Sequence, residues 1–522
     1  MARQLCQNHH IVVADWAFPE IQLSRYVNAY YPITSPEINL DACILGILEV
    51  VASEKIEAIL PITDAALEVM KASGNAFSGL EQWNVNEDSA YVYAHNKAHL
   101  IEVAGEVGIL SPASVLISTL AELDSFVPAW SFPCILKPVS SAVRVGNSVY
   151  GFGVRVCKDV NQIQDFGREI ILNTPFLIQE KVQGTGFGFN FFARNGEITA
   201  SYVHERLSEY NGQSGYRRSH DAKTFPMYAK CVELVRKIGW NGVGMLEFKV
   251  DGSNYYLMEL NGRFYGSSEV AIAAGLNFPR MLSGDLDERS APTKYRDAFV
   301  INFREELFKG LDQCVKTKKP SDLLSLGGRL LKSLFLSDHF VEDNLFTDTR
   351  FQFELYRKSI LGFLIKRRKK GRGVVIGDFI KPPNFLEGRA NQKICFVCFG
   401  NICRSPFAEV LASRMFPQHR FSSSGFYPQQ NRISPGFARK TALHFGVNLD
   451  RHQSSCMVES TPEVDYFIVF DELNLIQMLE KGVSAEKLIM LGPGIISDPY
   501  QKSEEEFQEC YRKIEAGLNR LF

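Results

Sequence analysis

Apolar and polar positions follow two different periods in the opening part of the chain. Short β-rich runs such as HIVVADW at 10–16 and IEAILPIT at 56–63 alternate with helical stretches such as CILGILEVVASEK at 43–55 and DAALEVMKAS at 64–73. Strands that alternate with helices are typical of an α/β domain. The pattern therefore predicts an α/β domain at the start of the chain.

Between Phe132 and Glu259 strand-like runs predominate, and turn residues mostly link them. The runs are FPCILKPV, PFLIQEKV, FNFFAR, EITASYVHERL, GMLEFKV and YYLMEL. Consecutive strands joined by turns favour antiparallel pairing. We therefore expect antiparallel sheet in this region, helix for most of 304–365, and a new strand from Lys393.

The length of the chain predicts several domains. It has 522 residues, of which 45% are hydrophobic and 22% charged, whereas a single core stops growing at about 250 to 300 residues. We expect a pre-domain at 1–90, a larger domain at 91–303, a helical segment with a basic linker at 304–391, and a C-terminal domain at 392–522. The predicted class is a multidomain α/β protein.

Charge, cysteine content and hydropathy argue against several classes of protein. The formal net charge of -2 disfavours a nucleic-acid-binding protein, which needs a concentrated positive field. The 11 cysteines show no spacing of a disulfide framework, which favours a reducing compartment. Neither an apolar stretch of signal-peptide length at the start nor an apolar span of about 20 residues is present. We expect a cytoplasmic protein without stable membrane insertion or a nucleic-acid partner.

Positive charge is concentrated in one short segment. Between Arg304 and Arg389 there are 18 Lys and Arg against 11 Asp and Glu, a net charge of +7, most of it in KRRKKGR at 366–372. Because this run follows FQFELYRKSILGFLI at 351–365, one interpretation is an interfacial helix on anionic lipid. A solvated linker after a packed helix is the favoured interpretation, since most charge runs are exposed faces or joints.

A cysteine lies at the end of the strand that starts at Lys393. After Cys398 come a short loop, Arg404 and the helical stretch SPFAEVLASRMF. Loop amides and a helix N-terminus converge on one point in such an arrangement and form an anion site. A positive site converts a thiol to a thiolate, and an arginine fork matches two oxygens of a phosphoryl group. A bare Cys-x5-Arg is often only a buried cysteine and a surface arginine, so the rest of the domain decides.

The rest of the domain carries a family pattern over about 393–522. Its parts are CFGNICRSP at 398–406, SSG at 423–425, LDRHQ at 449–453, FDELN at 470–474 and SDPY at 497–500, before a final helix. This string resembles the low-molecular-weight protein tyrosine phosphatase family. The resemblance implies a doubly wound parallel-sheet domain that hydrolyses phosphotyrosine or another aryl phosphate through a phosphocysteine intermediate.

The resemblance gives each matched residue a role. Cys398 is the nucleophile, and Arg404 clamps the phosphate. Ser405 hydrogen-bonds the thiolate, and Asn401 shapes the loop. Asp498 protonates the leaving oxygen and then acts as base on the hydrolytic water.

Further assignments follow from the same resemblance. His452 is the partner of the loop asparagine, and Tyr500 with either Phe426 or Tyr427 forms an aromatic rim for a flat substrate. Cys403 is placed to trap the oxidised nucleophile as a disulfide, and burial without a role is the equal alternative. Arsenate reduction on the same fold is disfavoured, because the further cysteine pair is missing while the SDPY acid is present.

The hairpin at 244–264 places two carboxylates against each other. Glu259 and Asn261 share one face of its second strand, and the turn brings Glu247 of the first strand almost opposite Glu259. Facing carboxylates repel unless a positive group lies between them. Glu and Asn oxygens suit Mg²⁺, so the hairpin predicts a magnesium site, with an exposed charged edge as the alternative for the hairpin alone.

Upstream features extend this pattern. CILKP places a lysine at a strand end, AHNKAHL opens a helix with another, and FLIQEKVQGTGFGFNFF offers an exposed backbone. With EFK and ELNGRF these features resemble an ATP-grasp enzyme over about residues 1–300. The resemblance implies lysines on the ATP phosphates, an adenine hinge, a site for Mg²⁺ with Mn²⁺ as the alternative, and an arginine facing an acyl phosphate. The lysines on the ATP phosphates are Lys97 and Lys137, and the adenine hinge is Gln179, Glu180, Lys181 and Val182. The metal ligands are Glu247, Glu259 and Asn261, and the arginine that faces the acyl phosphate is Arg263.

An enzyme of this kind activates a carboxylate as an acyl phosphate and passes it to an amine or another nucleophile. Arg206 with Arg217 or Arg218 is a candidate to bind the acceptor carboxylate, and a surface position in a mobile loop is the equal alternative. The glycine triplet within 184–188 predicts a flap over the phosphates. The pre-domain starts at its first helix and second strand, so it is shortened or its start codon is assigned too late.

Together the resemblances predict a two-enzyme chain. An ATP-grasp fold with a shortened pre-domain carries a Mg-ATP-dependent ligase, and a doubly wound domain carries the phosphatase. For the N-terminal half, an ATP-binding regulatory module and a small-molecule kinase stay open as alternatives. The expected partners are a phosphotyrosine protein or a phosphorylated small molecule for the phosphatase, and a carboxylate and an amine for the ligase.

Overall fold

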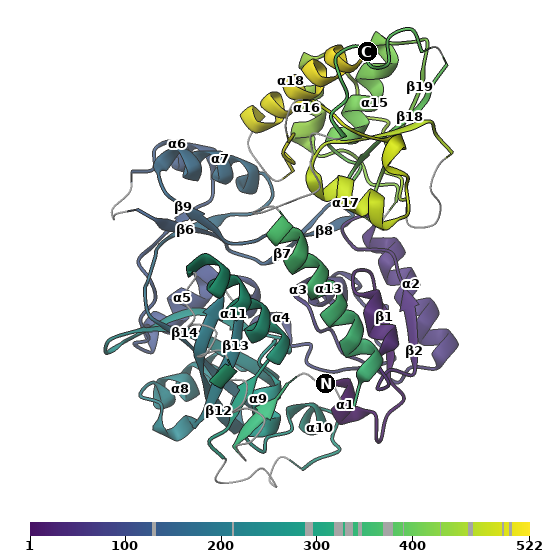
Figure 1. The fold of residues 1–522 in the computed structure, drawn as a ribbon. Coiled ribbons are helices and arrows are strands. Elements are labelled where there is room, and N and C mark those ends of the chain that lie inside the picture. Colours follow the sequence, from purple (N-terminus) through teal and green to yellow (C-terminus); the bar gives the residue numbers. More distant parts are fainter. Residues whose placement is uncertain are drawn as a thin grey trace. The chain divides into compact units, whose positions relative to one another are not determined.

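The computed structural model describes the chain as two compact units, Met1–Ile360 (unit 1) and Leu361–Phe522 (unit 2) (Figure 1). It describes all residues except 128–131, 211–212, 288–295, 318–326, 329–337, 343–346, 369–378, 390, 428–429, 458–462, 493–494 and 501–503. The basic run KRRKKGR therefore lies outside the described residues beyond Arg368. Within the described ranges, no helix has both the length and the hydropathy of a membrane span.

Unit 1 opens with the predicted alternation of helices and strands. The elements are α1 (Ala2–Leu5), β1 (Val12–Asp15), β2 (Ala29–Pro32), α2 (Leu40–Glu54), β3 (Ala58–Ile59), α3 (Asp64–Ala72) and β4 (Glu81–Gln82). β1 pairs with β2 and β3 with β4, both in parallel. The side chains of Asn39 and Thr63 cap α2 and α3 by accepting backbone N–H bonds, which explains where these helices begin.

A four-stranded antiparallel sheet follows in unit 1. Its order is β5 (Ser114–Ile117), β10 (Phe176–Glu180), β6 (Cys134–Pro138) and β9 (Arg155–Cys157). The helices of this part are α4 (Asp88–His95), α5 (Lys97–Glu106), α6 (Leu120–Asp124) and α7 (Val160–Ile171). A separate hairpin of β7 (Ala142–Val145) and β8 (Ser148–Gly151) follows β6. Because β10 runs antiparallel to β6, the end of β6 lies beside the start of β10, where Pro138 pairs with Phe176.

The second sheet of unit 1 has seven strands. In spatial order they are β15 (Asn254–Asn261), β14 (Gly242–Asp251), β11 (Thr185–Arg194), β12 (Glu197–Tyr210), β13 (Gln213–Asp221), β16 (Phe299–Ile301) and β17 (His339–Val341). All neighbours pair antiparallel except β16 with β17. Residues on alternate positions of β11, such as Phe189 and Phe191, pack into one core with Trp240 and α8 (Tyr228–Ile238). The predicted antiparallel sheet is confirmed.

The segment expected to be largely helical is only partly so. It contains α11 (Phe303–Thr317) and α13 (Thr349–Arg368), but β17 lies between them and extends the seven-stranded sheet. The short run HFV carries too little pattern for a strand prediction, and only pairing with β16 fixes its backbone. The small helices α9 (Glu269–Ala273) and α10 (Phe278–Leu282) complete the described elements of unit 1.

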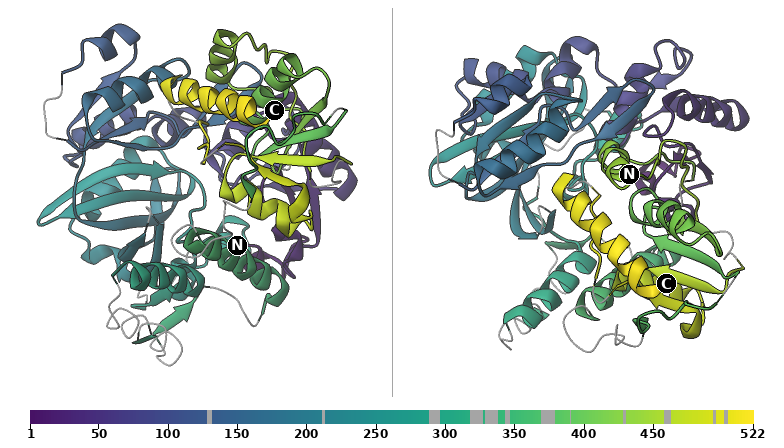
Figure 2. Two further views of the ribbon diagram at one scale, coloured as in Figure 1. Left: turned by 45° about the horizontal axis from the view of Figure 1, so that its top comes forward. Right: turned by 90° about the horizontal axis from the view of Figure 1, so that it is seen from above.

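Unit 2 is built on a four-stranded parallel sheet. Its order is β19 (Arg420–Gly425), β18 (Lys393–Cys398), β20 (Tyr466–Val469) and β21 (Leu488–Met490). Its helices are α15 (Arg404–Met415), α16 (Gly436–His444), α17 (Glu472–Glu480) and α18 (Glu504–Leu521), the last seen as the long yellow helix in Figure 2. Successive residues of β18 point to opposite faces of the sheet and enter two different cores. Phe396 packs in the core with α15, α16 and α18, and Val397 packs in the core with α17. Helices therefore cover both faces, and the predicted doubly wound sheet is confirmed.

The order of these strands determines where a ligand can bind in unit 2. From β18 the chain continues to a neighbour on one side, β19, and then to one on the other side, β20. Crevices in parallel sheets form outside the carboxyl ends of strands where the order reverses. Cys398 is the last residue of β18 and lies at that point.

Candidate active sites

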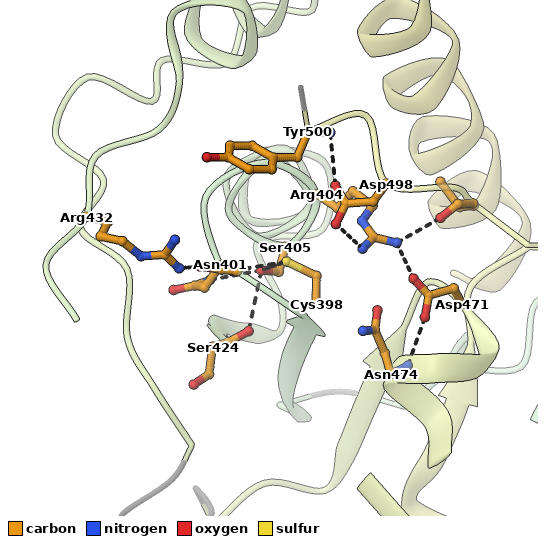
Figure 3. A network of polar contacts seen from close by, with 12 residues as sticks. Cys398, Asn401, Arg404, Ser405, Ser424, Arg432, Asp471, Asn474, Asp498 and Tyr500 are labelled. Atoms are coloured by element: carbon orange, nitrogen blue, oxygen red, sulfur yellow. Dashed lines mark hydrogen bonds and ion pairs between the residues drawn. The ribbon is translucent and has the colours of Figure 1, made fainter. Parts of the chain in front are cut away.

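The loop after β18 surrounds the sulfur of Cys398 with hydrogen bonds (Figure 3). Cys398 is 2% exposed, and its Sγ accepts the backbone N–H of Asn401 at 3.2 Å. The Ser405 hydroxyl lies 3.0 Å from the same sulfur. Because that hydroxyl oxygen already accepts a bond from the Asn401 side chain at 2.9 Å, its own hydrogen is available to the sulfur. The loop therefore offers donors to a negatively charged sulfur.

Asn401 holds the shape of this loop. Its φ of 50° is a left-handed conformation, which asparagine tolerates better than most residues. Its amide donates to the Ser423 hydroxyl at 2.8 Å and accepts the Ser455 backbone N–H at 2.7 Å. Its backbone carbonyl lies 2.7 Å from Nε2 of His452. The partnership of Asn401 and His452 expected from the sequence is present.

Arg404 lies between two carboxylates. It is the first residue of α15, and its guanidinium donates to Asp471 and to Asp498, each at 2.6 Å, and to the Ile496 carbonyl at 2.9 Å. Burial lowers the pKa of Arg404, but Asp498, Cys398 and Asp471 outweigh it and raise the pKa above its usual value. The arginine is 1% exposed, so these contacts fix its position beside the nucleophile.

The structure distinguishes between the two alternatives, Phe426 and Tyr427, for the second residue of the aromatic rim. Tyr500 is 46% exposed, and its backbone N–H donates to Asp498 Oδ1 at 3.1 Å. Tyr427 is half-buried and packs edge-on against Phe399. Phe426 belongs to the core that includes α17, so its assignment to the rim is corrected. In the alternating pattern of this segment, Phe426 faces the core and Tyr427 does not.

In unit 1 the two hairpin carboxylates are directly opposite each other. Glu247 of β14 pairs with Glu259 of β15, close to the predicted arrangement, and a register shift between Glu247 and Phe248 makes the pairing direct. Met245 pairs with Asn261. Burial raises the pKa of Glu247. Lys137, with Nζ 3.3 Å from Glu259, holds the pKa of Glu259 low, at about 2. The pair is therefore kept together by cations.

Two lysines converge beside these carboxylates. Lys137 near the end of β6 also donates to the Met258 carbonyl at 2.9 Å, and Lys97 at the start of α5 donates to the Ser141 hydroxyl at 2.9 Å. Both are 5% exposed. Burial lowers the pKa of Lys97 to about 8, and Glu259 acts in the opposite direction. The negative charge of Glu259 thus offsets only part of the cost of burying the charged Lys97 side chain.

The predicted adenine hinge lies at the end of β10. Gln179 is buried and donates to the Ser114 hydroxyl at 2.9 Å, while no side-chain or backbone donor in the described parts of the chain reaches its Oε1. Glu180 ends β10, and the side chains of Glu180 and Lys181 are exposed while Val182 is half-buried. An exposed backbone therefore follows a buried, partly unsatisfied glutamine.

The predicted arginines all pair with carboxylates. Arg263 makes a two-pronged contact with Asp64, with both N–O distances 2.9 Å. On β12 and β13, three arginines pair with acidic side chains at 2.8 to 2.9 Å: Arg206 with Glu247, Arg217 with Glu342, and Arg218 with Asp297. These residues lie in strands, which overturns the alternative of a mobile loop.

The glycine flap prediction is wrong for two of its three residues. Gly186 and Gly188 lie within β11, where both pair with β14 and Gly188 also pairs with β12. A Cβ on Gly186 would come within 2.7 Å of Arg206, and one on Gly188 within 2.3 Å of His204. These glycines therefore make room for the side chains of β12 rather than lending flexibility.

Comparison with known proteins identifies unit 2. A family model described as low molecular weight phosphotyrosine protein phosphatase matches residues 393–522. The low molecular weight protein-tyrosine-phosphatase PtpB of Staphylococcus aureus is 50% identical over 134 residues, which are 25% of this chain and 96% of that protein. The chain belongs to the low molecular weight phosphotyrosine protein phosphatase family. This membership rests on the C-terminal domain alone.

Solved structures also resemble the N-terminal part of the chain. The alignment with an L-amino acid ligase from Bacillus licheniformis covers 52% of this chain and 68% of the ligase chain, with 15% sequence identity and a TM-score of 0.40. A second match is the biotin carboxylase domain of a Hydrogenobacter thermophilus 2-oxoglutarate carboxylase, solved with MgADP, ADP and bicarbonate. That alignment covers 57% of this chain and 70% of the carboxylase chain, with 14% sequence identity and a TM-score of 0.45. At these TM-scores the likeness assigns no activity to unit 1.

Two residues of the phosphatase site carry no role in the sequence interpretation. Asp471 lies in the FDELN segment and holds Arg404, and Arg432 lies beside the nucleophile loop in Figure 3. The matched segment pointed to Asp471, but no local pattern marks Arg432. Cys403 is a free, buried thiol whose pKa burial raises well above its usual value, and its redox role stays a prediction.

Proposed function

We propose that unit 2 hydrolyses a phosphate monoester through a phosphocysteine on Cys398. The observation that carries this is the convergence of the Asn401 N–H, the Ser405 hydroxyl and the Arg404 guanidinium around one sulfur at the end of a parallel strand. Donors fixed in place before the reaction stabilise a thiolate and the charge of a transferring phosphoryl group. The catalytic set is Cys398, Arg404, Asp498, Ser405 and Asn401.

The chemistry is two displacements at phosphorus. The Cys398 sulfur forms a bond to phosphorus while the bond to the ester oxygen breaks, and Asp498 gives that oxygen its proton. Water then attacks the phosphocysteine, Asp498 takes its proton, and the S–P bond breaks to release phosphate. Asp498 Oδ2 now accepts an N–H of Arg404 at 2.6 Å. The incoming phosphoryl oxygens must take over that donor before Asp498 can present a proton.

The proposed substrate is a phosphotyrosine protein, with a phosphorylated small molecule as the second candidate. Tyr500 and Tyr427 supply the aromatic surfaces for a flat substrate beside the nucleophile loop. The cysteine content supports a cytoplasmic setting, where such substrates occur.

For unit 1 we propose a Mg-ATP-dependent ligase of the ATP-grasp type. The observation that favours it is the set of two opposed carboxylates and two buried lysines, Glu247, Glu259, Lys97 and Lys137. No group of three or more His, Cys, Asp or Glu in the described residues could hold a metal, but two glutamates with Asn261 form an all-oxygen set that fits Mg²⁺ or Mn²⁺. When bound, the ion would offset charge on the transferring phosphoryl group.

The other residues of this site divide the remaining tasks. Lys97 and Lys137 would hold the ATP phosphates, and the orphaned Gln179 Oε1 with the backbone of 180–182 would hold adenine. Arg263 would face the acyl phosphate only after leaving Asp64. Arg206, Arg217 and Arg218 likewise hold carboxylates of this chain and would bind an acceptor carboxylate only after leaving them.

The experiment that tests both proposals uses Cys398→Ser beside the wild type. Each protein is incubated with ATP, Mg²⁺ and a small-molecule extract of its host, and ADP and new masses are followed. We expect ADP and a condensation product from both. A phosphorylated product that accumulates only with Cys398→Ser would place both sites on one small molecule, and the absence of ADP from both would overturn the ligase.

Glu259→Gln is the matched variant for unit 1. It should abolish ADP formation and leave aryl phosphate hydrolysis intact, whereas Cys398→Ser should do the reverse. Loss of both activities in Glu259→Gln would instead favour the ATP-binding regulatory module. Phosphorylation of a metabolite without condensation would favour the small-molecule kinase.

A further inference from the structure

Three successive carbonyls of the nucleophile loop are held from outside by groups beyond the loop. The Phe399 carbonyl accepts the backbone N–H groups of Phe426 and Tyr427, both at 2.9 Å. The Gly400 carbonyl accepts a guanidinium N–H of Arg432. The Asn401 carbonyl lies 2.7 Å from His452 Nε2. Each carbonyl is thereby fixed pointing away from the sulfur.

In a trans peptide the C=O of one residue and the N–H of the next point in opposite directions. A group that holds the Gly400 carbonyl on the outside therefore turns the Asn401 N–H to the inside. That N–H is the one that donates to Cys398 Sγ at 3.2 Å. A hydrogen bond on the carbonyl also polarises the same peptide and strengthens its N–H as a donor.

Arg432 is itself held in a fixed place. Its guanidinium carbon lies 4.2 Å from the centre of the Tyr427 ring, and its backbone N–H donates to the Ser454 hydroxyl at 3.0 Å. Figure 3 shows the side chain directed toward the nucleophile loop. Burial lowers the pKa of the Arg432 guanidinium.

We propose that Arg432 is a positioning residue of the phosphatase, which fixes the Gly400–Asn401 peptide so that its N–H stabilises the Cys398 thiolate. This proposal rests on the proposed phosphatase function in one respect, because both concern Cys398 as the nucleophile. It predicts that a residue touching neither the sulfur nor the phosphate controls how reactive the sulfur is.

Other charged or titratable groups also face Cys398 and must stay unchanged in the test. They are Arg404 from α15, Asp498 through Arg404, Cys403 in the loop, and Cys510 and Tyr511 from α18. Arg432→Met alters none of them. It removes the donor to the Gly400 carbonyl and the positive charge, while its unbranched side chain can still cover the Tyr427 ring.

The readout is alkylation of Cys398 by iodoacetamide, followed on its own peptide by mass spectrometry. The rate at pH 6 divided by the rate at pH 9 reports the thiolate fraction, because only the thiolate reacts. We expect this ratio to fall at least about twofold in Arg432→Met, because the thiolate loses a donor on which the thiol does not depend. No substrate is needed, so the result stands even if the domain proves to hydrolyse another class of phosphate.

Arg414→Met is the matched control. Arg414 also donates to backbone carbonyls, those of Gly446 at 2.8 Å and Phe445 at 2.9 Å, but at the far end of α15 from the nucleophile. Its loss should leave the alkylation ratio at the wild-type value. An unchanged ratio in Arg432→Met, or an equal fall in Arg414→Met, would overturn the positioning role.

Arg432→Lys separates orientation from charge and serves if the methionine variant does not fold. Lysine keeps the positive charge but lacks the planar fork that reaches the Gly400 carbonyl while lying on a ring. If the orientation of the peptide matters, Arg432→Lys lowers the ratio in the same direction as Arg432→Met. A wild-type ratio in Arg432→Lys would mean that charge alone acts and would overturn the proposal.

Discussion

The two candidate sites arrange charge in opposite ways. In unit 2 one buried cation, Arg404, lies between two carboxylates next to a loop whose Asn401 N–H donates to the nucleophile. In unit 1 two half-buried carboxylates lie opposite each other, and each has its own cation, Lys137 for Glu259 and Arg206 for Glu247. The site in unit 2 suits an anionic ligand such as a phosphate ester. The site in unit 1 suits a metal cation bound together with an anionic ligand such as ATP.

The sites also differ in how their parts are brought together. The nucleophile, the loop donors and the arginine of unit 2 come from one stretch of eight residues, 398–405. The charged groups of unit 1 come from β6, β12, β14, β15 and the start of α5. The loop residues are neighbours in the sequence and need outside contacts only to hold their orientation, whereas the dispersed site depends on strand register for its assembly. The two sites should therefore fail separately and for different reasons.

The largest effect is expected from breaking the opposed pair in unit 1. Glu259→Gln removes the charge that holds Lys137 and one of the oxygen ligands proposed for the metal, so ATP-dependent activity should fall by about 10³-fold. ADP formation in the host extract measures this. Asp471→Asn is the counterpart in unit 2, where Arg404 still keeps Asp498. A smaller effect of Glu259→Gln on ADP formation than of Asp471→Asn on phosphatase activity would contradict the comparison.

A second variant tests whether the carboxylates of unit 2 are equivalent. Asp498→Asn should lower hydrolysis of phosphotyrosine by about 10²-fold, because its leaving oxygen needs a proton. Hydrolysis of 4-nitrophenyl phosphate, whose leaving group is a better anion, should fall much less. Steady-state kinetics on both esters is the measurement. Equal losses on both would mean that Asp498 acts only by holding Arg404 and not as an acid.

The phosphatase site was the more predictable of the two because its chemistry is local. A strand, a loop and a helix in sequence order bring Cys398, Asn401 and Arg404 to one point, and long-range contacts then fix their side chains. The facing of the two glutamates of unit 1 was predictable to within one residue, since the period of two and a tight turn set the register near the turn. The register then shifts between Glu247 and Phe248, which places Glu247 opposite Glu259 and which the pattern does not reveal.

The contacts that sequence reasoning missed are long-range. Arg432 lies 32 positions from the Gly400 carbonyl that it holds, and Asp64 lies 199 positions from Arg263. The error over Gly186 and Gly188 has the same origin, since only the neighbouring strand shows that His204 and Arg206 fill the space above them. A glycine pattern alone does not distinguish a flexible flap from a crowded sheet.

The electrostatics of Lys97 give unit 1 a pH dependence that unit 2 does not share. Its pKa of about 8 lies below the value of about 10.4 expected for an unfolded chain, so the folded site without ATP loses this proton as the pH rises through 8. ATP binding must then return the proton, and affinity for Mg-ATP should fall by about tenfold per pH unit above pH 8. Calorimetry in buffers of different ionisation enthalpy measures both the affinity and the proton uptake.

Lys97→Met is the control for this pH dependence. It should bind Mg-ATP more weakly at pH 7 and lose the additional fall above pH 8. The sign for stability is the reverse of that for binding: between about pH 8 and 10.4 the unfolded chain binds more protons, so Lys97 contributes an increase in unfolding free energy with pH. An ATP affinity that stays constant from pH 7.5 to 9 in the wild type would contradict the burial of this lysine.

The smallest effect concerns the rim of unit 2 and separates recognition from chemistry. Tyr500→Ala should raise the KM for aryl phosphates by about threefold, since an aromatic contact contributes about 0.5 to 1.5 kcal/mol, and should leave alkyl phosphates unchanged. The backbone N–H that Tyr500 donates to Asp498 survives the substitution, so kcat should stay constant. Tyr500→Phe keeps the ring and should match the wild type. If the KM for both classes of ester rises equally, the Tyr500 side chain does not recognise the aromatic ring of the substrate. The preference for aryl phosphates would then have to come from Tyr427 instead.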